Sequence, residues 1–211
     1  MRIGLISDTH IPVAAKELWP QVYEAFRGAT PGGTPVDMIM HAGDLMVPEV
    51  IDWLEEVAPV MAVQGNGDYL GWERSIAPQD RRLSEAKVLT VDPAPGRAAV
   101  WPSASGDPTR ASLLGGQAGR AIRIGLVHDL QLPDAPPLRT LEGQMRHYFG
   151  GPVNVIVRGS THAAEITSVK GVLIVNPGST AFPNHQSARL GTVGFLDIEG
   201  GRVRPSILQL V

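Results

Sequence analysis

The sequence contains no cysteine, carries no excess of positive charge and has few aromatic residues. Without cysteine the chain cannot form disulfides, use a thiolate nucleophile or bind metal through sulfur, so any metal must be held by His, Asp, Glu or Asn. The 18 basic and 21 acidic residues give a net charge of −3, so nucleic-acid binding is not indicated. No apolar run is long enough to span a bilayer, and no apolar signal-peptide core precedes Asp8. We therefore expect a soluble cytoplasmic protein without membrane association.

The composition is that of an ordinary globular protein. The 211 residues are 43% hydrophobic and 18% charged, which is enough apolar material for a sizeable core. Short runs rich in β-branched residues, most of them next to Gly, Pro, Asn or Asp, predict strands. These runs are Ile3–Ile6, Val36–Met40, Val60–Val63, Lys87–Val91, Ile122–Val127, Val153–Val157, Gly171–Val175 and Thr192–Ile198. Apolar residues at helical spacing predict helices that end before Gly28, before Pro59 and at Phe149.

The order of these elements indicates the fold class. The first half alternates strands and helices, which implies parallel strands, and the last part has strands separated by glycine turns, which favours antiparallel hairpins. We predict one mixed α/β domain over residues 1–211. The segment Asp92–Ala121, rich in Pro, Gly and Ala, has no clear periodicity. We expect it to be a long surface loop joining two hairpin strands, and a lid or an assembly arm is the alternative.

Several predicted strands end in polar residues of the kinds that bind metals. Function gathers at the carboxyl ends of strands in open α/β sheets, so these strand exits would deliver their side chains to one rim. The side chains are those of Asp8, His10, Asp44, Asn66, His128 and His162. Asp8 and His10 are two residues apart, and in an extended chain both would project from the same face. Carboxylate, amide and imidazole groups together suit Mn²⁺, Fe²⁺ or Zn²⁺, and a cation would offset the cost of burying them.

Each of these features has a structural explanation when it stands alone. An Asp-x-His pair serves as a turn or a cap, a Gly-Asp pair serves as a turn, and a single histidine is more often a hydrogen-bonded core residue than a ligand. The metal interpretation rests on the ordered set, in which every member follows a strand. His41 is expected to be a buried core histidine, with contact to the ligands as the alternative, and His147 and His185 are expected to be surface residues.

The ordered motifs resemble the calcineurin-like metallophosphoesterases, in particular their small single-domain bacterial and archaeal phosphodiesterase branch. The motifs are Asp8-x-His10, Gly43-Asp44, Gly65-Asn66-x-Asp68, His128, Gly159-x-x-His162 and Asn176-Pro177-Gly178-Ser179. The resemblance implies a four-layer αββα sandwich of two mixed β-sheets with a binuclear metal centre at the sheet edge. It implies that the first metal is held by Asp8, His10 and His162, that Asp44 bridges both metals, and that the second is held by Asn66 and His128.

The resemblance also implies the chemistry. Two divalent cations, most simply Mn²⁺ with Fe, Zn or Ni as alternatives, would activate a bridging hydroxide for attack on phosphorus and neutralise charge on the phosphoryl oxygens. Asp44, Asn66 and His128 are the implied catalytic residues. The expected substrate is a small-molecule or nucleotide phosphodiester, or an aryl phosphate ester. Asn176 is expected to tie the surrounding loops together through hydrogen bonds.

Three positions depart from the family pattern. Ser160 stands where a histidine that binds the second metal is usual, so the second site should be weaker or completed by water. Gly67 stands where many relatives carry a histidine thought to protonate the leaving group, so good leaving groups should be preferred. Asp129 stands where glycine is common, and it either replaces glycine in the turn or leans toward the second metal.

Two of these departures, Ser160 and Gly67, also favour a different interpretation. In it, the chain is a metallophosphoesterase-like scaffold that binds partners and has weakened catalysis. The ligands for the first metal and the bridging Asp44 favour an enzyme, because a pure scaffold would not need them. The sequence therefore predicts a metal-dependent phosphoesterase, and more specifically a phosphodiesterase.

Overall fold

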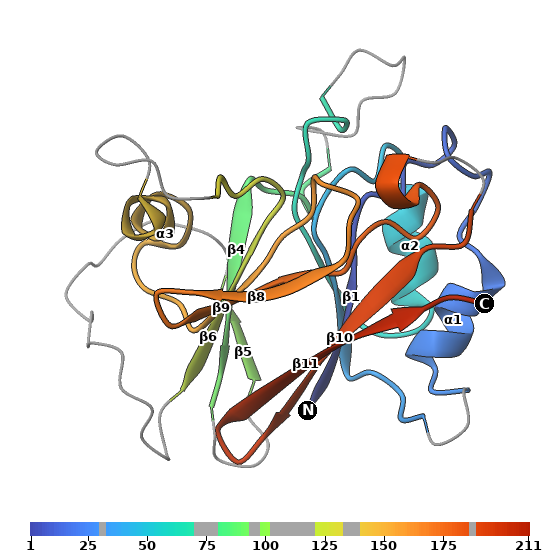
Figure 1. Ribbon diagram of the computed structural model, residues 1–211. Coiled ribbons are helices and arrows are strands. Elements are labelled where there is room, and N and C mark those ends of the chain that lie inside the picture. Colours follow the sequence, from blue (N-terminus) through green and yellow to red (C-terminus); the bar gives the residue numbers. More distant parts are fainter. Residues whose placement is uncertain (30–32, 70–79, 93–97, 102–120, 133–139, 186–188) are drawn as a thin grey trace.

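Two β-sheets lie face to face with helices on their outer sides. The computed structural model describes residues 1–29, 33–69, 80–92, 98–101, 121–132, 140–185 and 189–211. Helix α3 covers one side of the molecule and helices α1 and α2 the other, with both sheets between them (Figure 1). The predicted αββα sandwich of two mixed sheets is confirmed. Across the described residues, no helix combines the length and the apolar character that crossing a bilayer requires.

The first sheet is built around the N-terminal strand. Its strands, from edge to edge, are β11 (Arg202–Gln209), β10 (Thr192–Glu199), β1 (Arg2–Ile6), β2 (Met38–His41) and β3 (Val60–Ala62). Strands β1, β2 and β3 are parallel and are connected by α1 (Pro20–Phe26) and α2 (Glu49–Glu55), as the alternating pattern predicted. Strands β10 and β11 form the predicted antiparallel hairpin, and β10 pairs with β1.

The second sheet has a parallel centre and antiparallel edges. Its strands, from edge to edge, are β5 (Ala98–Trp101), β4 (Ala86–Val91), β6 (Ile122–Val127), β7 (Val155–Val157), β9 (Val172–Asn176) and β8 (Glu165–Val169). Strands β6, β7 and β9 are parallel, and helix α3 (Leu141–Phe149) lies between β6 and β7 in the chain. A short 3₁₀ turn, η2 (Pro183–His185), follows β9.

Side-chain alternation along the strands divides the apolar residues into three layers. Leu5 of β1 packs between the sheets with Leu126 and Val157 of the second sheet. The next residue of β1, Ile6, points outward and packs with α1 and α2, while Met145 of α3 covers the outer face of the second sheet. Both sheets are therefore packed on both faces, and their strand ends form a fixed edge on which a site can be built.

The predicted loop at 92–121 needs a correction. It does join two antiparallel strands, β4 and β6, as expected. Within it, however, Ala98–Trp101 forms the strand β5, which pairs with the outer edge of β4 in the register Val88↔Trp101 to Val91↔Ala98. An unpaired edge strand offers free N–H and C=O groups. A following segment that runs back along that edge can pair with them even when its own sequence has no clear strand pattern. The remaining residues of the loop, 93–97 and 102–120, lie outside the described part.

Two helices approach their sheets so closely that a glycine is needed beneath each. A Cβ built on Gly4 of β1 would lie 2.8 Å from the ring of Phe26, and a Cβ on Gly125 of β6 would lie 2.6 Å from the ring of Phe149. Each ring belongs to the last residue of its helix. The two glycines therefore set the distance between helix and sheet on opposite sides of the molecule.

We expect Gly125→Ala to lower the free energy of unfolding by about 1–3 kcal/mol, because the added methyl group would push the Phe149 ring from its place in a close-packed core. Chemical denaturation would measure the change. The same substitution in a Phe149→Leu background should cost less, since the smaller side chain leaves room for the methyl group. An equal cost in both backgrounds would show that this contact is not the cause.

Candidate metal centre

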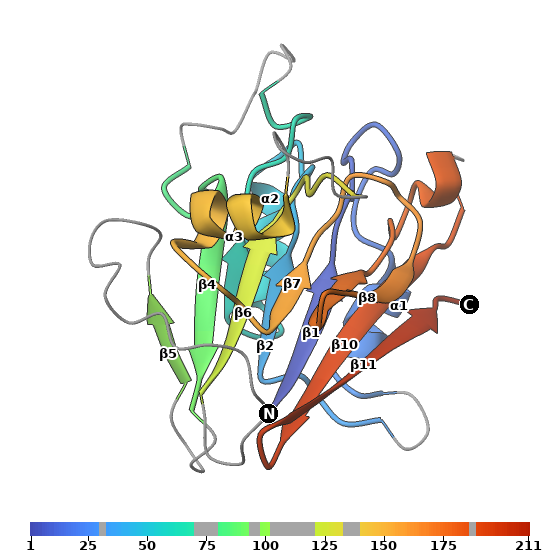
Figure 2. The ribbon, with the colours of Figure 1, turned by 60° about the vertical axis from the view of Figure 1, so that its left-hand side comes forward.

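The candidate ligands all follow strands whose carboxyl ends meet at one edge of the sandwich. Figure 2 shows the arrowheads of β1, β6 and β7 pointing toward that edge. The two sheets are joined there by a parallel bridge between Ser7 and Ser179, and the Ser179 hydroxyl donates a hydrogen bond to the backbone oxygen of Asp8 (2.6 Å). Residues that are far apart in the sequence are thus brought side by side, as the strand-end pattern predicted.

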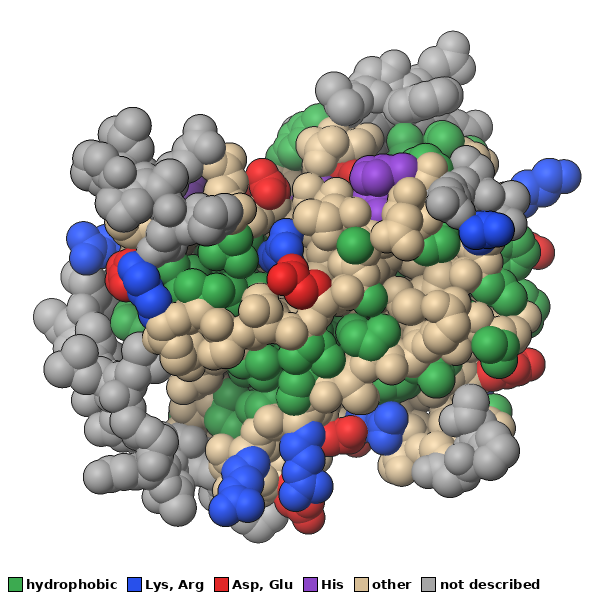
Figure 3. All heavy atoms as spheres, viewed as in Figure 1, with side chains coloured by type: hydrophobic (Ala, Val, Ile, Leu, Met, Phe, Trp, Pro, Cys, Tyr) green, Lys and Arg blue, Asp and Glu red, His purple; other side chains and the backbone are tan. Residues whose placement is uncertain are grey.

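Four of the predicted ligands form one tight cluster. Asp8, His10, Asp44 and His162 each contribute one ligand atom, and these atoms all lie within 4.8 Å of one another. The Nε2 atoms of His10 and His162 are 3.1 Å apart, and His162 Nε2 is 3.5 Å from Asp8 Oδ1. Asp8, Asp44 and His162 are buried and His10 is half-buried. In the space-filling view, histidine side chains reach the surface at the upper edge of the molecule (Figure 3).

The two remaining predicted ligands form a second group that shares Asp44 with the first. His128 Nε2 lies 3.2 Å from Asn66 Oδ1. Asp44 Oδ2 lies 3.5 Å from His128 Nε2 and 3.4 Å from His10 Nε2. One carboxylate oxygen thus stands between the two groups, which is the position that a shared ligand would occupy.

Backbone contacts fix which ring nitrogen faces the centre. His128 Nδ1 lies 2.7 Å from the carbonyl oxygen of Ala42, and His162 Nδ1 lies 3.0 Å from that of Phe182. A carbonyl oxygen only accepts, so each Nδ1 carries the hydrogen and each Nε2 keeps its lone pair toward the cluster. This arrangement of the outer nitrogen is typical of metal-binding histidines.

The backbone conformation that brings these ligands together differs from the predicted one. Asp8 and His10 were expected to share a face of extended chain, but β1 ends at Ile6 and both residues have positive φ, 52° and 47°. Asp44 (56°) and His162 (58°) also lie in the left-handed region. This region is unfavourable for residues with a Cβ, and such strain collects at functional sites when the surrounding structure enforces it. The ligands therefore converge through tight left-handed turns rather than by strand alternation.

The electrostatics of the cluster fit a divalent cation. Burial raises the pKa of Asp8 from 3.8 to about 7, against the opposing effects of His128 and the Ser7 hydroxyl. Burial also lowers the pKa of His10 to about 4 and lowers the pKa of His162. Carboxylates and neutral imidazoles are thus held away from water without a compensating charge. A divalent cation would supply that charge, and the mixture of oxygen and imidazole donors suits Mn²⁺, Fe²⁺ or Zn²⁺.

The carboxylate of Asp68 holds two of the loops together, a role that sequence reasoning missed. It accepts hydrogen bonds from the backbone N–H groups of Asp44 (3.1 Å), Met46 (2.7 Å) and Gly65 (2.7 Å). Burial raises its pKa, an effect that the N–H groups of Gly65 and Met46 partly oppose. The signal in the sequence was the Gly-Asn-Gly-Asp turn, in which a buried acid can collect the free amides of neighbouring turns.

Asn176 ties the sheet-edge loops together as predicted. Its side-chain nitrogen donates to the Gly159 oxygen and to the Thr161 hydroxyl, both at 2.9 Å, and its side-chain oxygen accepts from the Gly178 N–H at 2.8 Å. It therefore connects the end of β9 to the loop that carries His162.

The three departures from the family pattern are placed differently. The backbone N–H of Ser160 donates to both carboxylate oxygens of Asp8 at 3.2 Å, so the main chain of Ser160 supports a ligand of the first cluster. A contact between its hydroxyl and a second metal stays a prediction. Asp129 is exposed and does not have positive φ, so it is not needed as a substitute for glycine in a left-handed turn. The backbone N–H of Gly67 donates to Asp44 Oδ1 at 2.7 Å.

His147 and His185 are surface residues, as predicted, and His185 also contacts the metal centre. His147 on α3 is exposed, with a side chain that is 67% accessible. His185 is also exposed, but its ring stacks on that of His162 with centroids 4.2 Å apart, so it belongs to the rim of the centre. Sequence reasoning missed this contact because η2, which ends at His185, is an irregular turn with left-handed φ at Asn184 and His185.

His41 is a buried core histidine, as expected. Its Nδ1 accepts from the Gly43 N–H (3.2 Å), so its Nε2 carries the hydrogen and faces the Thr9 hydroxyl (3.3 Å). Burial lowers its pKa from 6.5 to about 3. His41 therefore holds, in its neutral form, the residues that precede His10 and Asp44.

The pH dependence of stability should report this neutral histidine. Below pH 6.5 the unfolded chain binds a proton at His41 that the folded chain does not bind until about pH 3. The free energy of unfolding should therefore fall by about 1.4 kcal/mol per pH unit from this residue as the pH decreases through that window. His41→Asn can keep the bond to Gly43 but cannot titrate, so denaturation curves at several pH values should show a shallower slope for the variant. Parallel slopes would contradict the assignment.

Comparisons with known proteins bear on the family and the fold of this chain. A probable metallophosphoesterase of Methanothermobacter thermautotrophicus is 29% identical over 212 residues, which cover 99% of this chain and 92% of the relative. An archaeal phosphodiesterase of known structure is 20% identical, with a TM-score of 0.54 over 99% of this chain and 100% of that one. Vps29 from Entamoeba histolytica, solved with Zn²⁺, is 19% identical, with a TM-score of 0.56 over 100% of both chains. At these identities the two solved structures show the fold alone.

The family itself follows from a match that covers nearly the whole chain. Residues 1–201 match the calcineurin-like phosphoesterase superfamily domain, a range that includes all the strands ending in candidate ligands. The chain therefore belongs to the calcineurin-like phosphoesterase superfamily.

Proposed function

We propose that this chain is a metal-dependent phosphodiesterase that acts on small-molecule or nucleotide phosphodiesters with good leaving groups. The observation that carries the proposal is the position of Asp44, whose Oδ2 lies 3.4 Å from His10 Nε2 and 3.5 Å from His128 Nε2. A carboxylate oxygen between two groups of donors is what two cations with a common ligand require. Membership of the superfamily and the shared fold with an archaeal phosphodiesterase support the same conclusion.

The proposal assigns each ligand to a cation. The first cation would be held by Asp8, His10, Asp44 and His162, and the second by Asp44, Asn66 and His128. When bound, the cations supply positive charge for the phosphoryl oxygens and lower the pKa of the attacking water. We propose Mn²⁺ as the native metal, with Fe, Zn and Ni as the alternatives to be compared, because the donor set mixes carboxylate, amide and imidazole.

The surrounding chain prepares these groups for that role. The Gly67 N–H fixes one oxygen of Asp44 and leaves the other facing both histidines. The Ala42 carbonyl fixes the ring of His128, whose Nε2 then faces Asn66. Asn66 is exposed, so its amide can also contact a substrate that enters from solvent. Asp44, Asn66 and His128 are therefore the proposed catalytic residues.

A leaving-group series tests the proposal. Gly67 cannot donate a proton, so a poor leaving group would depart without the about 10²–10⁴-fold help that a general acid gives. We expect the Mn²⁺-loaded protein to hydrolyse a 4-nitrophenyl phosphodiester at least about 10²-fold faster than the matching alkyl diester. The substrate series is preferable to Gly67→His, because a Cβ at this position would lie 3.1 Å from Asp44 Oδ1 and would disturb the carboxylate.

Two results would contradict the proposal. No hydrolysis of either ester with Mn²⁺, Fe²⁺, Zn²⁺ or Ni²⁺ would remove the enzymatic function. Comparable rates on both esters would be consistent with a hydrolase, but they would show that some other residue protonates the leaving group in place of the histidine that Gly67 replaces.

The second candidate function is a binding scaffold with weakened catalysis. It is favoured by Gly67 and Ser160, which stand where a proton donor and a metal ligand are expected, and by the shared fold with Vps29, a protein named for vacuolar sorting. The cluster of four ligand atoms argues against it, because burying carboxylates and imidazoles costs free energy that a bound cation would offset. A protein that binds no divalent cation and shows no hydrolysis would favour the scaffold.

A further inference from the structure

The outer ring nitrogen of His10 faces a sulfur atom, whereas those of the other two histidine ligands face oxygen. His10 Nδ1 lies 3.3 Å from the Sδ atom of Met46. The Nδ1 atoms of His128 and His162 lie 2.7 Å and 3.0 Å from backbone carbonyl oxygens. A thioether sulfur has no hydrogen to donate and can only accept. The Nδ1 of His10 therefore carries the hydrogen and donates it to Met46, and its Nε2 keeps its lone pair toward the cluster.

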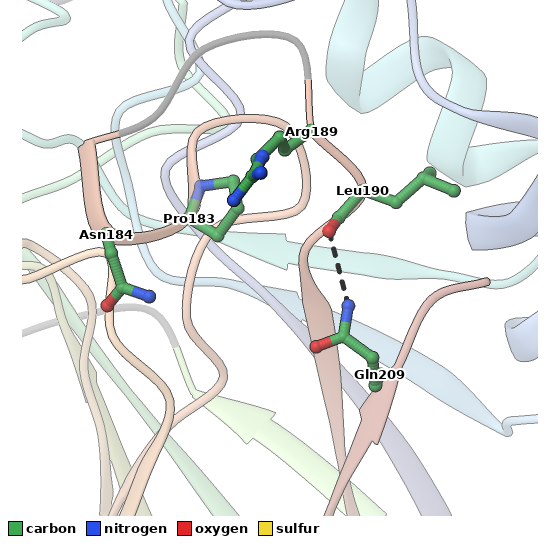
Figure 4. Close-up of a pocket in the computed structure, with 5 residues that line it drawn as sticks. All are labelled: Pro183, Asn184, Arg189, Leu190 and Gln209. Atoms are coloured by element: carbon green, nitrogen blue, oxygen red, sulfur yellow. Dashed lines mark hydrogen bonds between the residues drawn. The ribbon is translucent and has the colours of Figure 1, made fainter.

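The oxygen that supports His162 belongs to a backbone segment with further hydrogen bonds. It is the carbonyl oxygen of Phe182, and two residues later the N–H of Asn184 donates to the backbone oxygen of His162 (3.2 Å). Figure 4 shows Asn184 in one pocket with Gln209, whose side-chain nitrogen donates to the Leu190 oxygen (3.2 Å). The support of His162 is thus a main-chain oxygen, and it does not depend on which side chain stands at position 182.

The support of His10 is a side chain on a loop that also carries another ligand. The backbone N–H of Met46 donates to Asp68 Oδ1 (2.7 Å), and the backbone N–H of His10 donates to the oxygen of Asp44 (3.0 Å). Met46 has a φ of 73°, and strain of this kind is retained where the surrounding structure enforces it. These bonds fix the backbone of both residues, so the side chain of Met46 starts from a defined point beside the imidazole ring.

The acceptor at the outer nitrogen affects how well a histidine binds a cation. Such an acceptor fixes the tautomer, orients the ring and raises its basicity, and its loss typically lowers metal affinity by about 10–100-fold. A thioether sulfur is a weaker acceptor than a carbonyl oxygen, so it orients the ring with a smaller gain in basicity. Met46 is half-buried, and another apolar side chain of similar size would fill the same space without accepting the hydrogen.

We propose that Met46 is a positioning residue for the first cation and acts through a hydrogen bond from His10 to its sulfur. This role rests on the proposed function, which assigns His10 to that cation. Met46 holds the imidazole in the tautomer and the orientation in which Nε2 faces Asp44 and His162. The sulfur is the weakest of the three acceptors, so a single substitution at this position can strengthen a ligand as well as weaken it.

Replacing Met46 by leucine and by glutamine separates hydrogen bonding from apolar packing. Leucine is similar in volume but accepts no hydrogen bond, so calorimetry should show the first Mn²⁺ binding about tenfold more weakly. Glutamine supplies an amide oxygen, a stronger acceptor, and should bind this Mn²⁺ at least as tightly as the wild type. A packing role predicts the opposite order, with leucine tolerated and glutamine harmful, and that order would overturn the proposal.

A measurement on the metal-free protein tests the hydrogen bond itself. At alkaline pH, where the imidazole is neutral, ¹⁵N chemical shifts distinguish which ring nitrogen carries the hydrogen. His10 should be protonated at Nδ1 in the wild type and in Met46→Gln, and should become a mixture of tautomers in Met46→Leu. Met145→Leu, the same exchange in the outer layer on α3, should change neither the tautomer nor the Mn²⁺ affinity. A wild-type tautomer in Met46→Leu would show that another group holds the ring.

The outcomes also separate this role from the proposed function. If the wild type binds Mn²⁺ and hydrolyses the 4-nitrophenyl phosphodiester, and Met46→Leu has an unchanged Kd for Mn²⁺, the phosphodiesterase stands and the role of Met46 fails. If the wild type binds no divalent cation, the proposed function fails, and the role of Met46 in cation binding falls with it.

Discussion

Asp44→Asn should reduce hydrolysis of a 4-nitrophenyl phosphodiester by about 10³-fold or more. The cations that this carboxylate would share are worth several kcal/mol of transition-state stabilisation, and each 1.36 kcal/mol changes the rate tenfold. The substitution is nearly isosteric, and the amide oxygen of asparagine can still accept the 2.7 Å hydrogen bond from Gly67. Its NH₂ group, however, would take the place of the oxygen that faces His10 and His128, and an NH₂ group cannot bind a cation.

Asp129→Asn is the matched control for this experiment. It removes one negative charge from the residue next to His128, but Asp129 is exposed and lies outside the ligand cluster. Its activity should stay within about twofold of the wild type, as expected for a surface charge largely screened by solvent and salt. Metal content should fall in Asp44→Asn and stay constant in Asp129→Asn. Activity retained by Asp44→Asn with a normal metal content would contradict the shared position of this carboxylate.

The fold was predictable because its signals are local and repeat along the chain. The run Ile122–Val127 was predicted with the same limits as β6, since its isoleucine, leucine and valine residues begin directly after Ala121 and end before His128. The strand β5 was not predictable, because its pairing depends on a free edge of β4 that no local pattern reveals. The extent of a single domain over 1–211 stays a prediction.

The candidate site was predictable in its membership but not in its geometry. Every proposed ligand directly follows a strand or lies a few residues beyond it, so the topology alone brings them to one edge. The left-handed turns at Asp8, His10 and Asp44 were not predictable, because residues with a Cβ avoid this conformation unless tertiary contacts enforce it. The enforcing groups come from other loops, such as the Asp68 carboxylate with its three backbone donors, and the Gly-Asn-Gly-Asp turn that carries Asp68 does not reveal which loops it will contact.

Removal of divalent cations should both abolish hydrolysis and lower thermal stability. A cation present at about 100 times its Kd stabilises the folded state by about 2.7 kcal/mol, which corresponds to a Tm increase of about 5–10 °C for a chain of this size. We therefore expect the protein treated with a chelator to regain both activity and Tm when Mn²⁺ is added. Differential scanning calorimetry before and after addition measures the change in Tm.

The size of this Mn²⁺-dependent shift should increase with pH. In the absence of a cation, burial raises the folded-state pKa of Asp8 to about 7, above its unfolded value of 3.8, so the stability that this carboxyl contributes at low pH is lost as the pH rises through that window. A cation reverses this effect because it binds the ionised carboxylate, so the shift should be larger at pH 8 than at pH 5.5. His162→Ala should lose most of the shift, whereas His147→Ala, which removes an exposed imidazole from α3, should keep it. An equal shift in both variants would place the bound cation away from this edge of the sandwich.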